Sequence, residues 1–297
     1  MIKYSIIIPT HNRQYLLKRN IEYYSNFQNF QIYICDSSVE AYKTHEIPKH
    51  ITYIHMPNKS FVEKMYLQLN KIETKYVSVC ADDDFIMEHT TKEMILHMSK
   101  NNYVMSIGKY LGFDIPFNGF YEIYTDRKVP KSYRDPEKML KSYLSNYYMS
   151  LWATYEAKTI IKAYKILSKS KFSNDNLIEI VIAINCSLSG EIYFYNKVYG
   201  IREVNNSNSK NWAKKHPSLL KSYIKFNLIE DLKSLEKEFF REYNNNLFQK
   251  GIFYYIKDTF LKKIVAILRK KTERRYIYEQ NNKDLKEIIR IMHVNHE

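Results

Sequence analysis

Three consecutive carboxylates, Asp82, Asp83 and Asp84, follow a short apolar run in this chain. Adjacent carboxylates repel one another, so such a group is costly unless a cation neutralises it. Mg²⁺ and Mn²⁺ are the divalent ions that carboxylates hold together with the phosphates of a nucleotide. A helix N-cap, the structural alternative, needs only one of the three aspartates. The triplet therefore predicts a metal-assisted nucleotide site.

Strands and helices are predicted to alternate through the first third of the chain. Short apolar runs predict strands over residues 4–9, 31–35, 51–55 and 76–80, and helical spacing predicts helices over 14–24, 61–69 and 88–100. This alternation is typical of βαβ crossovers and predicts an α/β fold with a mostly parallel sheet and flanking helices. Ligands of such sheets bind beyond the carboxyl ends of the strands. Four polar segments are expected at this edge: 10–13, 36–38, 56–58 and 82–84.

The rest of the chain divides into a mixed part and a helical part. Up to residue 198 we predict strands at 103–107 and 192–198, an irregular aromatic stretch at 110–124, an extended segment at 149–155, and helices at 135–144, 157–167 and 174–188. Long helices without strands follow over 217–243, 248–270 and 281–292. These patterns predict a first domain over residues 1–208 and a basic α-helical region over 209–297.

Composition limits the class of protein. Of the 297 residues, 45% are hydrophobic and 26% are charged, which excludes a disordered or fibrous chain. The three cysteines have neither a disulfide framework nor metal-ligand spacing, so a reducing cytoplasm is expected. The first residues lack the features of a signal peptide, and no segment has the roughly twenty apolar residues of a membrane-spanning helix. A cytoplasmic location is therefore predicted.

Four segments resemble the family 2 glycosyltransferases, which are inverting enzymes with the GT-A fold and nucleotide-sugar donors. They are YSIIIPTHNR near the start, ICDSS at the second strand, YVSVCADDDF at the triplet and SNDNLIEIVIAINCSLSGEI beyond it. The resemblance spans residues 3–208. It implies a GT-A fold, which is Rossmann-like with a mostly parallel sheet and flanking helices, followed here by a C-terminal helical extension.

The resemblance also implies donor contacts at the strand ends. The loop after the first strand is implied to contact the base or the ribose through Thr10, Asn12 and Arg13. Asp36, at the end of the second strand, is implied to contact the base. Lys64, on the following helix, is implied to approach the diphosphate, with Asn58 nearby.

Within the triplet, the resemblance implies Asp83 as the metal-binding aspartate, Asp84 as a supporting metal ligand and Asp82 beside the ribose. Ala81 stands where the family often has an acidic residue, so the division of roles among the three aspartates stays open. Arg202, in a later loop that resembles the family's donor-covering loop, is implied to contact phosphate. The histidine that the family carries in this loop has no counterpart in the matching positions.

The family's catalytic base is an aspartate about fifteen residues before a glycine that precedes a strand. Asp175 stands at this distance from Gly190 and is the implied base, although Asn174 replaces the usual preceding glutamate. A purely structural alternative is that Asp175 or Ser173 caps the helix. Glu179, one helical turn further on, is the next candidate base.

The implied reaction is metal-dependent transfer of a sugar, with inversion, from a nucleotide-sugar donor to a glycan or lipid-linked acceptor. Mn²⁺ or Mg²⁺ stabilises the leaving diphosphate in such a reaction, and a carboxylate takes the acceptor's proton. By analogy with the family, the product is a bacterial surface glycan such as capsule or lipopolysaccharide. Two alternatives stay open. One is a nucleotidyltransferase, whose usual glycine-rich loop residues 2–20 lack, and the other is a nucleotide-sugar-binding protein without activity.

The segment 248–275 contains nine Lys and Arg but only two Asp and Glu, interleaved with apolar residues. A basic amphipathic helix of this kind suits an anionic membrane, here the cytoplasmic face of the inner membrane, where lipid-linked acceptors lie. A packing helix in a C-terminal bundle or an oligomer interface is the second interpretation. Nucleic acid ranks last, because the first domain has nothing that contacts the bases of a polymer, and no nucleic-acid partner is expected.

Overall fold

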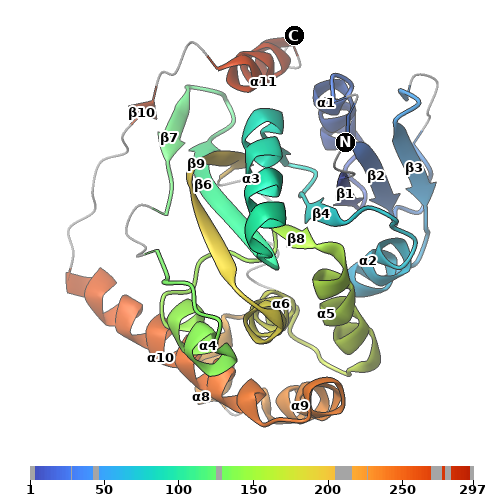
Figure 1. Ribbon diagram of the computed structural model, residues 1–297. Helices are drawn as coiled ribbons and strands as arrows, with labels where there is room; N and C mark the ends of the chain where they lie inside the picture. Colours follow the sequence, from blue (N-terminus) through green and yellow to red (C-terminus); the bar gives the residue numbers. More distant parts are fainter. Residues whose placement is uncertain are drawn as a thin grey trace.

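The computed structural model describes residues 4–27, 29–42, 47–124, 129–204, 216–225, 227–268, 276–277 and 282–294. In this part of the chain ten strands form one sheet (Figure 1). They are β1 (Tyr4–Thr10), β2 (Gln31–Asp36), β3 (Ile51–His55), β4 (Tyr76–Val79), β5 (Asp84–Ile86), β6 (Met105–Phe113), β7 (Phe120–Glu122), β8 (Thr154–Glu156), β9 (Ile192–Glu203) and β10 (Tyr276–Ile277).

The described helices are α1 (Gln14–Tyr24), α2 (Phe61–Leu69), α3 (Glu88–Asn101), α4 (Pro136–Leu144), α5 (Ala157–Lys169), α6 (Asn176–Ser189), α8 (Leu219–Ile224), α9 (Ile229–Tyr243), α10 (Leu247–Leu268) and α11 (Lys283–Val294). Helix α2 packs against α5, which packs against α6, and α6 in turn contacts α4. Helix α11 packs against α1.

The strand order is β10-β7-β6-β8-β4-β1-β2-β3, with β9 beside β6 and β5 beside β9. Strands β3, β2, β1 and β4 are parallel neighbours, and so are β6 and β9. The short strand β8 joins these two parallel groups by pairing antiparallel with both β4 and β6. The predicted α/β class is confirmed, and the antiparallel pairs lie between and beyond the two parallel groups.

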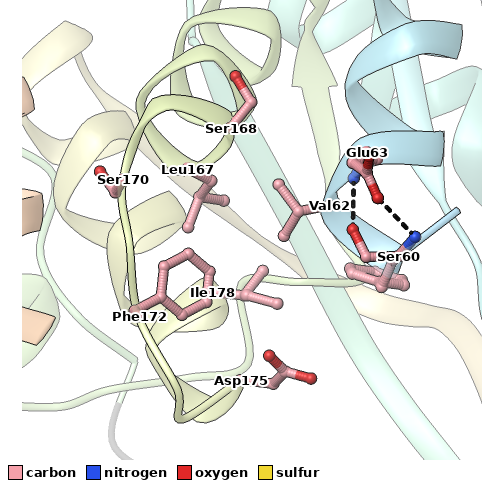
Figure 2. A pocket seen from close by; sticks show the side chains of 10 residues that line it. Ser60, Val62, Glu63, Leu167, Ser168, Ser170, Phe172, Asp175 and Ile178 are labelled. Atoms are coloured by element: carbon pink, nitrogen blue, oxygen red, sulfur yellow. Dashed lines mark hydrogen bonds between the residues drawn. The ribbon is translucent and has the colours of Figure 1, made fainter.

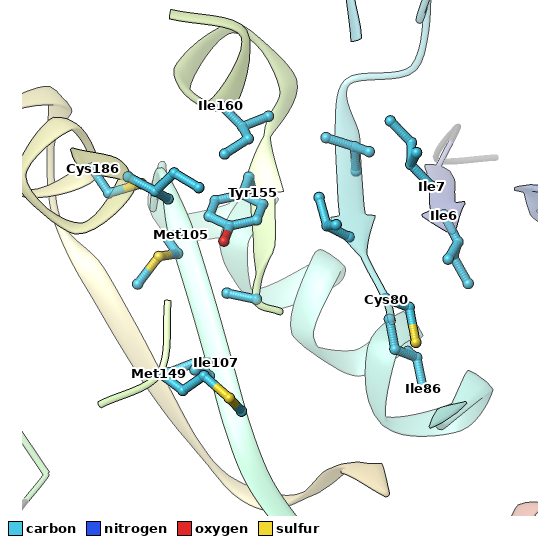
Figure 3. Close-up of a cluster of buried hydrophobic side chains, with 14 of the residues drawn as sticks. Ile6, Ile7, Cys80, Ile86, Met105, Ile107, Met149, Tyr155, Ile160 and Cys186 are labelled. Carbon is cyan, nitrogen blue, oxygen red and sulfur yellow. The ribbon is translucent and has the colours of Figure 1, made fainter. Parts of the chain in front are cut away.

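Strand β1 is covered on both of its faces. All seven of its residues are buried, and Ile6 and Ile7, which point to opposite faces of the strand, are each 0% exposed. Figure 3 shows both side chains in the buried cluster that also holds Cys80. A parallel strand with both faces covered carries a continuous apolar run, which is why this segment was recognisable in the sequence.

Four elements differ from the sequence prediction. Strand β6 continues to Phe113 through the stretch predicted to be irregular, because its second half pairs with both β7 and β9. The triplet leads into a strand, β5, which was missed because its partner β9 lies far away in the sequence. The predicted helix over 217–243 is two helices, α8 and α9, and the predicted extended segment at 149–155 contains only β8.

The C-terminal helices contact the predicted first domain at two places. Helix α10 packs against α4 and α6, and α9 packs against α5. On α11, Arg290 lies 2.8 Å from the carboxylate of Glu22 in α1. The carboxylate of Asp284, also on α11, accepts hydrogen bonds from the backbone amides of Glu88 and His89 at the beginning of α3. The predicted boundary at 208/209 lies outside the described residues, and among the described helices we find none long and apolar enough to span a bilayer.

Candidate active site

The carboxyl ends of β1, β2 and β4 bring the predicted donor residues together. Thr10 pairs with Asp36 in the β1–β2 register, and Ile7 pairs with Val79 in the β1–β4 register. The triplet therefore begins beside the end of β1. The hydroxyl of Thr10 donates a hydrogen bond of 2.7 Å to Oδ2 of Asp82.

Arg13 lies between two carboxylates of the triplet. Its Nη1 atom is 2.6 Å from Oδ1 of Asp82 and 3.2 Å from Oδ2 of Asp83. Burial raises the pKa of Asp82, and the guanidinium of Arg13 opposes that rise. The two carboxylates thus converge on one cationic atom, as expected from their mutual repulsion.

Asp84 has a different environment from the other two aspartates. It belongs to β5, is 2% exposed, and pairs across the β5–β9 register with Arg202, whose Nε lies 3.2 Å from its Oδ2. Burial raises the pKa of Asp84, and Arg202 opposes the rise. Arg202 also donates a hydrogen bond of 2.7 Å to the hydroxyl of Tyr124. Arg202, which was predicted to contact phosphate, therefore contacts Asp84 and Tyr124 of the protein in this structure.

The donor set near Arg13 fits a hard divalent cation. Two carboxylates converge there, and ions such as Mg²⁺ are usually held by one or two carboxylates together with substrate phosphates and water. Asp83 is associated through Arg13 with Asp82, whereas Asp84 contacts Arg202. Among the described residues, no three His, Cys, Asp or Glu side chains form a group that could hold a metal by themselves. A cation at this place would be held by carboxylates together with substrate phosphates and water.

Asp36 is fully buried and organises the loop that follows β2. Its Oδ1 accepts hydrogen bonds from the amide of Ser38 at 2.8 Å and from the hydroxyl of the same residue at 2.5 Å. Its Oδ2 accepts a 2.7 Å hydrogen bond from the hydroxyl of Tyr53. The Ser38 hydroxyl oxygen also accepts a 2.7 Å hydrogen bond from the amide of Asn12, which has a positive φ of 54°. Asp36 therefore fixes both loops that border the expected nucleotide position.

Lys64 ties the ends of the first two strands together. Its side chain is buried, and Nζ donates to the carbonyl oxygen of Thr10 at 2.6 Å and to the hydroxyl of Ser37 at 3.0 Å. Burial lowers the pKa of Lys64 to about 8. Asn58 is exposed and has a positive φ of 62°. In this structure Lys64 lies beneath the loops that follow β1 and β2.

Asp175 borders a pocket of about 240 Å³ that the N-terminus of α2 also lines (Figure 2). Although Asp175 occupies the N-cap position of α6, its side chain makes no capping hydrogen bond. The carboxylate is 32% exposed. The pocket is lined by Ser60, Phe61, Val62, Glu63, Leu167, Ser168, Ser170, Phe172, Asp175 and Ile178. These contacts do not support capping as the role of the Asp175 side chain.

Topology places Asp175 at the same edge of the sheet as the triplet. Strands β4 and β6 are both antiparallel to β8, so they run in one direction. Helix α6 ends just before β9, whose Ile192 pairs with Met105 at the start of β6. The end of α6 therefore lies at the amino edge of these strands, whereas the pocket at its beginning is also lined by Ser60, which follows the carboxyl end of β3. Helix α2 connects the two parts, because Lys64 contacts the donor loops and Ser60 lines the pocket.

Glu179, the second candidate base, faces another direction. Its side chain is hydrogen bonded to the hydroxyl of Tyr147, which is buried, and it does not line the pocket. The geometry therefore favours Asp175 of the two.

Sequence reasoning missed Arg19 and Asn20, which support the triplet from below. Arg19 donates to the carbonyl oxygen of Asp83 at 3.0 Å and pairs with Glu203 at 2.9 Å, and Asn20 donates to the carbonyl oxygen of Asp82 at 2.7 Å. The sequence held a signal for them, because Arg19 and Asn20 lie on the same helical stripe as the buried residues Leu16, Tyr23 and Tyr24. Polar residues on a buried stripe indicate polar partners.

Comparison with known proteins identifies the family. Residues 5–174, more than half of the chain, match the profile described as glycosyl transferase family 2. The chain belongs to this family. The match confirms the family predicted from the sequence and places the protein among the glycosyltransferases. Comparison with curated protein sequences found no match.

Solved structures of similar fold come from S. aureus TarS. The structure of TarS 1–349 in complex with UDP-GlcNAc has a TM-score of 0.56 and 16% identity, covering 98% of this chain and 82% of that chain. Another TarS structure has a TM-score of 0.45 and 16% identity, and this chain spans only 44% of its length while 83% of this chain is covered. At 16% identity, the likeness to TarS 1–349 shows the fold alone, and it agrees with the predicted GT-A class.

Proposed function

We propose that this glycosyltransferase transfers a sugar, with inversion and with the help of a divalent cation, from a nucleotide-sugar donor to a glycan or lipid-linked acceptor. The observation that carries the proposal is the position of two groups at one edge of the sheet. Arg13, Asp82 and Asp83 form a charged cluster there, and Asp175 borders a pocket reached along α2. Donor activation and proton removal need these two groups on opposite sides of the reacting carbon.

The donor is proposed to bind over the ends of β1, β2 and β4. Thr10, Asn12, Arg13 and Asp36 surround the proposed base and ribose position, and Lys64, Asn58 and Arg202 border the proposed diphosphate position. UDP-GlcNAc is the first donor to test, because a protein of similar fold has been solved with it. Lys64 supports the loops from beneath, so its proposed effect on the diphosphate acts through the carbonyl of Thr10 and the hydroxyl of Ser37.

Asp83 is proposed to hold Mn²⁺ or Mg²⁺ with Asp84 in β5 as a supporting ligand, and Asp82 is proposed to lie beside the ribose. When bound, the cation would stabilise negative charge on the leaving diphosphate without proton transfer. Arg13 already places a positive charge between Asp82 and Asp83. Its guanidinium therefore balances one of these two negative charges when no cation is bound.

Asp175 is proposed to accept the proton of the acceptor hydroxyl. Its exposed carboxylate borders a pocket whose apolar walls, including Phe172 and Leu167, alternate with serine hydroxyls. A sugar ring has an apolar face and a polar rim, so this lining suits the terminal residue of a glycan. Attack from this side, opposite the leaving diphosphate, inverts the anomeric carbon.

Helix α10 is the proposed contact with an anionic membrane. Phe248 and Ile252 are buried, while Phe253, Phe260 and Leu261 are about half exposed. Lys257 and Lys263 are exposed on the same helix. This arrangement combines packing on the first domain with an exposed apolar and basic surface, as a peripheral protein at the cytoplasmic face needs for reaching a lipid-linked capsule or lipopolysaccharide precursor. Part of the predicted segment, residues 269–275, lies outside the described residues.

Liposome co-sedimentation tests the membrane proposal. Binding to anionic but not to zwitterionic vesicles is expected at low salt, weakening well above roughly 0.15 M because exposed charges are screened. Replacing Lys257 and Lys263 with Gln should weaken this binding and leave UDP release unchanged. A change of oligomeric state in the substituted protein would instead identify α10 as an interface between copies.

The central experiment measures UDP release from UDP-GlcNAc and a panel of other nucleotide sugars, with Mn²⁺, with Mg²⁺ and with EDTA. Turnover that requires a divalent cation supports the proposal. A raised melting temperature with a donor but no turnover would favour the non-catalytic alternative, since a ligand that binds only the native state stabilises it. Pyrophosphate release from a nucleoside triphosphate and a sugar phosphate would favour a nucleotidyltransferase.

A further inference from the structure

Arg202 lies at the carboxyl edge of the sheet, where the donor is proposed to bind. It pairs with Gly112 near the end of β6, and β6 runs in the same direction as β4, because both strands are antiparallel to β8. The side chain of Arg202 is 27% exposed, whereas that of its partner Asp84 is 3% exposed. The guanidinium therefore extends from a buried carboxylate to the solvent at this edge.

Tyr124, which follows β7, contacts the same guanidinium from a second side. Its hydroxyl oxygen accepts a hydrogen bond of 2.7 Å from Nη1 of Arg202. The hydroxyl in turn donates to the sulfur of Met149 at 3.8 Å. Met149 is 5% exposed and belongs to the buried cluster shown in Figure 3. The hydroxyl of Tyr124 is thus held between the core and Arg202.

The backbone is arranged in an uncommon way to bring Tyr124 to this place. Tyr124 has a φ of 61°, which bulky residues rarely adopt, and such outliers are concentrated at functional sites. Gly112 lies between β7 and β9, and a Cβ atom there would come within 2.7 Å of Ile123 and 3.0 Å of Val204. The missing side chain at Gly112 therefore lets the segments that carry Tyr124 and Arg202 meet over β6.

The ring of Tyr124 is fixed as well. It packs edge-to-face against Tyr148 with ring centroids 5.8 Å apart, and Tyr148 packs in the same way against Phe194. A tyrosine side chain has only two rotatable dihedral angles that place its ring, so little entropy is lost when the ring is held. The hydroxyl is therefore a rigid hydrogen-bond acceptor for Arg202.

We propose that Tyr124 is a positioning residue that orients Arg202 toward the β-phosphate of the donor, and so makes the site selective for a nucleoside diphosphate over a monophosphate. This inference rests on the proposed diphosphate position beside Arg202. A guanidinium is planar and rigid, so contacts of Nε with Asp84 and of Nη1 with Tyr124 fix the direction of Nη2. Nη2 then donates to a phosphate oxygen.

The expected contribution of Tyr124 is geometric rather than electrostatic. Its hydroxyl is neutral, so removing it leaves the charges of Arg202 and Asp84 unchanged and alters only the direction of the guanidinium. A monophosphate keeps the base, the ribose and the α-phosphate of the donor and lacks the group that Arg202 is proposed to contact. The affinities for a diphosphate and a monophosphate of the same nucleoside therefore separate this role from a general loosening of the site.

Two matched substitutions remove one hydroxyl each from the same part of the chain. Tyr124→Phe removes the group that contacts Arg202 and keeps the ring, and Tyr121→Phe removes a hydroxyl in β7 that donates to Asp114. Calorimetric titrations with UDP and UMP are made in EDTA, so that no cation contributes to a preference for the diphosphate. If sugar release identifies another donor nucleoside, its diphosphate and monophosphate are the probes.

Tyr124→Phe is expected to weaken UDP binding about tenfold and to leave UMP binding within about twofold of the wild type. Tyr121→Phe should change neither affinity. Melting temperatures of both variants report whether the fold is retained. Parallel losses of UDP and UMP affinity in Tyr124→Phe, or the same loss of UDP affinity in Tyr121→Phe, would indicate a loosened β7 and would overturn the proposal.

An Arg202→Met background tests whether the effect passes through the guanidinium. In this background Tyr124→Phe should cause no further loss of UDP affinity, because the group that it orients is gone. An equal loss in both backgrounds would overturn the proposal. If Arg202→Met does not fold, the ratio of UDP to UMP affinity in Tyr124→Phe decides, since a lowered ratio supports the proposal and an unchanged ratio overturns it.

The outcomes distinguish failure of this inference from failure of the proposed function. Equal affinities of the wild type for UDP and UMP would reject the proposed diphosphate position beside Arg202, and the role of Tyr124 with it. A wild type that prefers UDP, together with an unchanged preference in Tyr124→Phe, would reject only the role of Tyr124.

Discussion

The carboxyl edge of β1, β2 and β4, called the donor edge below, and the loop of the proposed base differ in how their carboxylates are paired. At the donor edge, Asp82 and Asp83 are paired with Arg13, and Asp84 is paired with Arg202. Asp175 has a more exposed carboxylate, which approaches the imidazole of His216. The difference matches the chemistry proposed for each place. A site for a cation and a diphosphate can carry charges that are balanced in advance, whereas a base needs a carboxylate with an oxygen open to the acceptor.

The sharpest test of this contrast removes the exposed carboxylate. Asp175→Asn keeps the size of the side chain but removes its capacity to take a proton, so transfer should fall by about 10² to 10⁴, the usual contribution of general-base catalysis. Affinity for UDP-GlcNAc should stay within a few-fold of the wild type, because Asp175 borders the proposed acceptor pocket. Steady-state kinetics and donor titration measure the two effects separately.

Glu179→Gln is the matched control for the same helix. Because this side chain is hydrogen bonded to Tyr147 and does not line the pocket, its substitution should leave transfer largely intact. A normal rate in Asp175→Asn combined with a large loss in Glu179→Gln would place the base one helical turn further along α6.

The next test concerns the charge balance at the donor edge. Asp83→Asn should lower transfer at least about a hundredfold, which corresponds to about 3 kcal/mol of transition-state stabilisation, with the fold intact. Nucleotide affinity should also become nearly independent of Mn²⁺, because one of the two carboxylates that converge on Arg13 has lost its charge. Unchanged turnover at saturating Mn²⁺ would remove Asp83 from the proposed ligands.

The smallest expected effect is a pH dependence of stability at the donor loops. Burial lowers the pKa of Lys64 from 10.5 to about 8. Between these values the unfolded chain binds a proton that the folded protein lacks, so stability from this group increases as the pH rises and is lost as the pH falls through about 8. The melting temperature of the wild type relative to Lys64→Met should therefore rise between pH 8 and 10. A difference that stays constant over this range would show that Lys64 titrates normally.

The donor edge was accessible to sequence reasoning because its residues follow buried strands. Thr10, Asp36 and the triplet each end an apolar run, and parallel strands bring such ends together. The family resemblance added roles to these positions. The contact between Arg13 and the two carboxylates could not be derived, because the direction of a loop side chain depends on φ values such as the positive one at Asn12.

The surroundings of the proposed base could not be predicted from the sequence in the same way. Asp175 itself was found from its distance to Gly190, but neither His216 nor Asp231, which accept hydrogen bonds from the backbone amides of residues 173–175, carries a local signal that would connect it to residue 175. His216 lies just before α8 and Asp231 lies in α9, whereas a single continuous helix was predicted over 217–243. The pairing of Arg202 with Asp84 likewise depends on strand β5, which was not predicted. Contacts of this kind depend on tertiary packing rather than on sequence periodicity.

The attachment of α11 to α1 has a consequence for the synthesis of the protein. Arg290 and Glu22 are separated by 268 positions, and Asp284 completes the beginning of α3. At a translation rate of about 5–20 residues per second, α1 leaves the ribosome on the order of 10–50 s before α11 can reach it. During that interval the nascent donor half lacks its covering helix. We expect the newly emerged segment to be handled by chaperones in this period and to acquire its protection from proteolysis only when α11 docks.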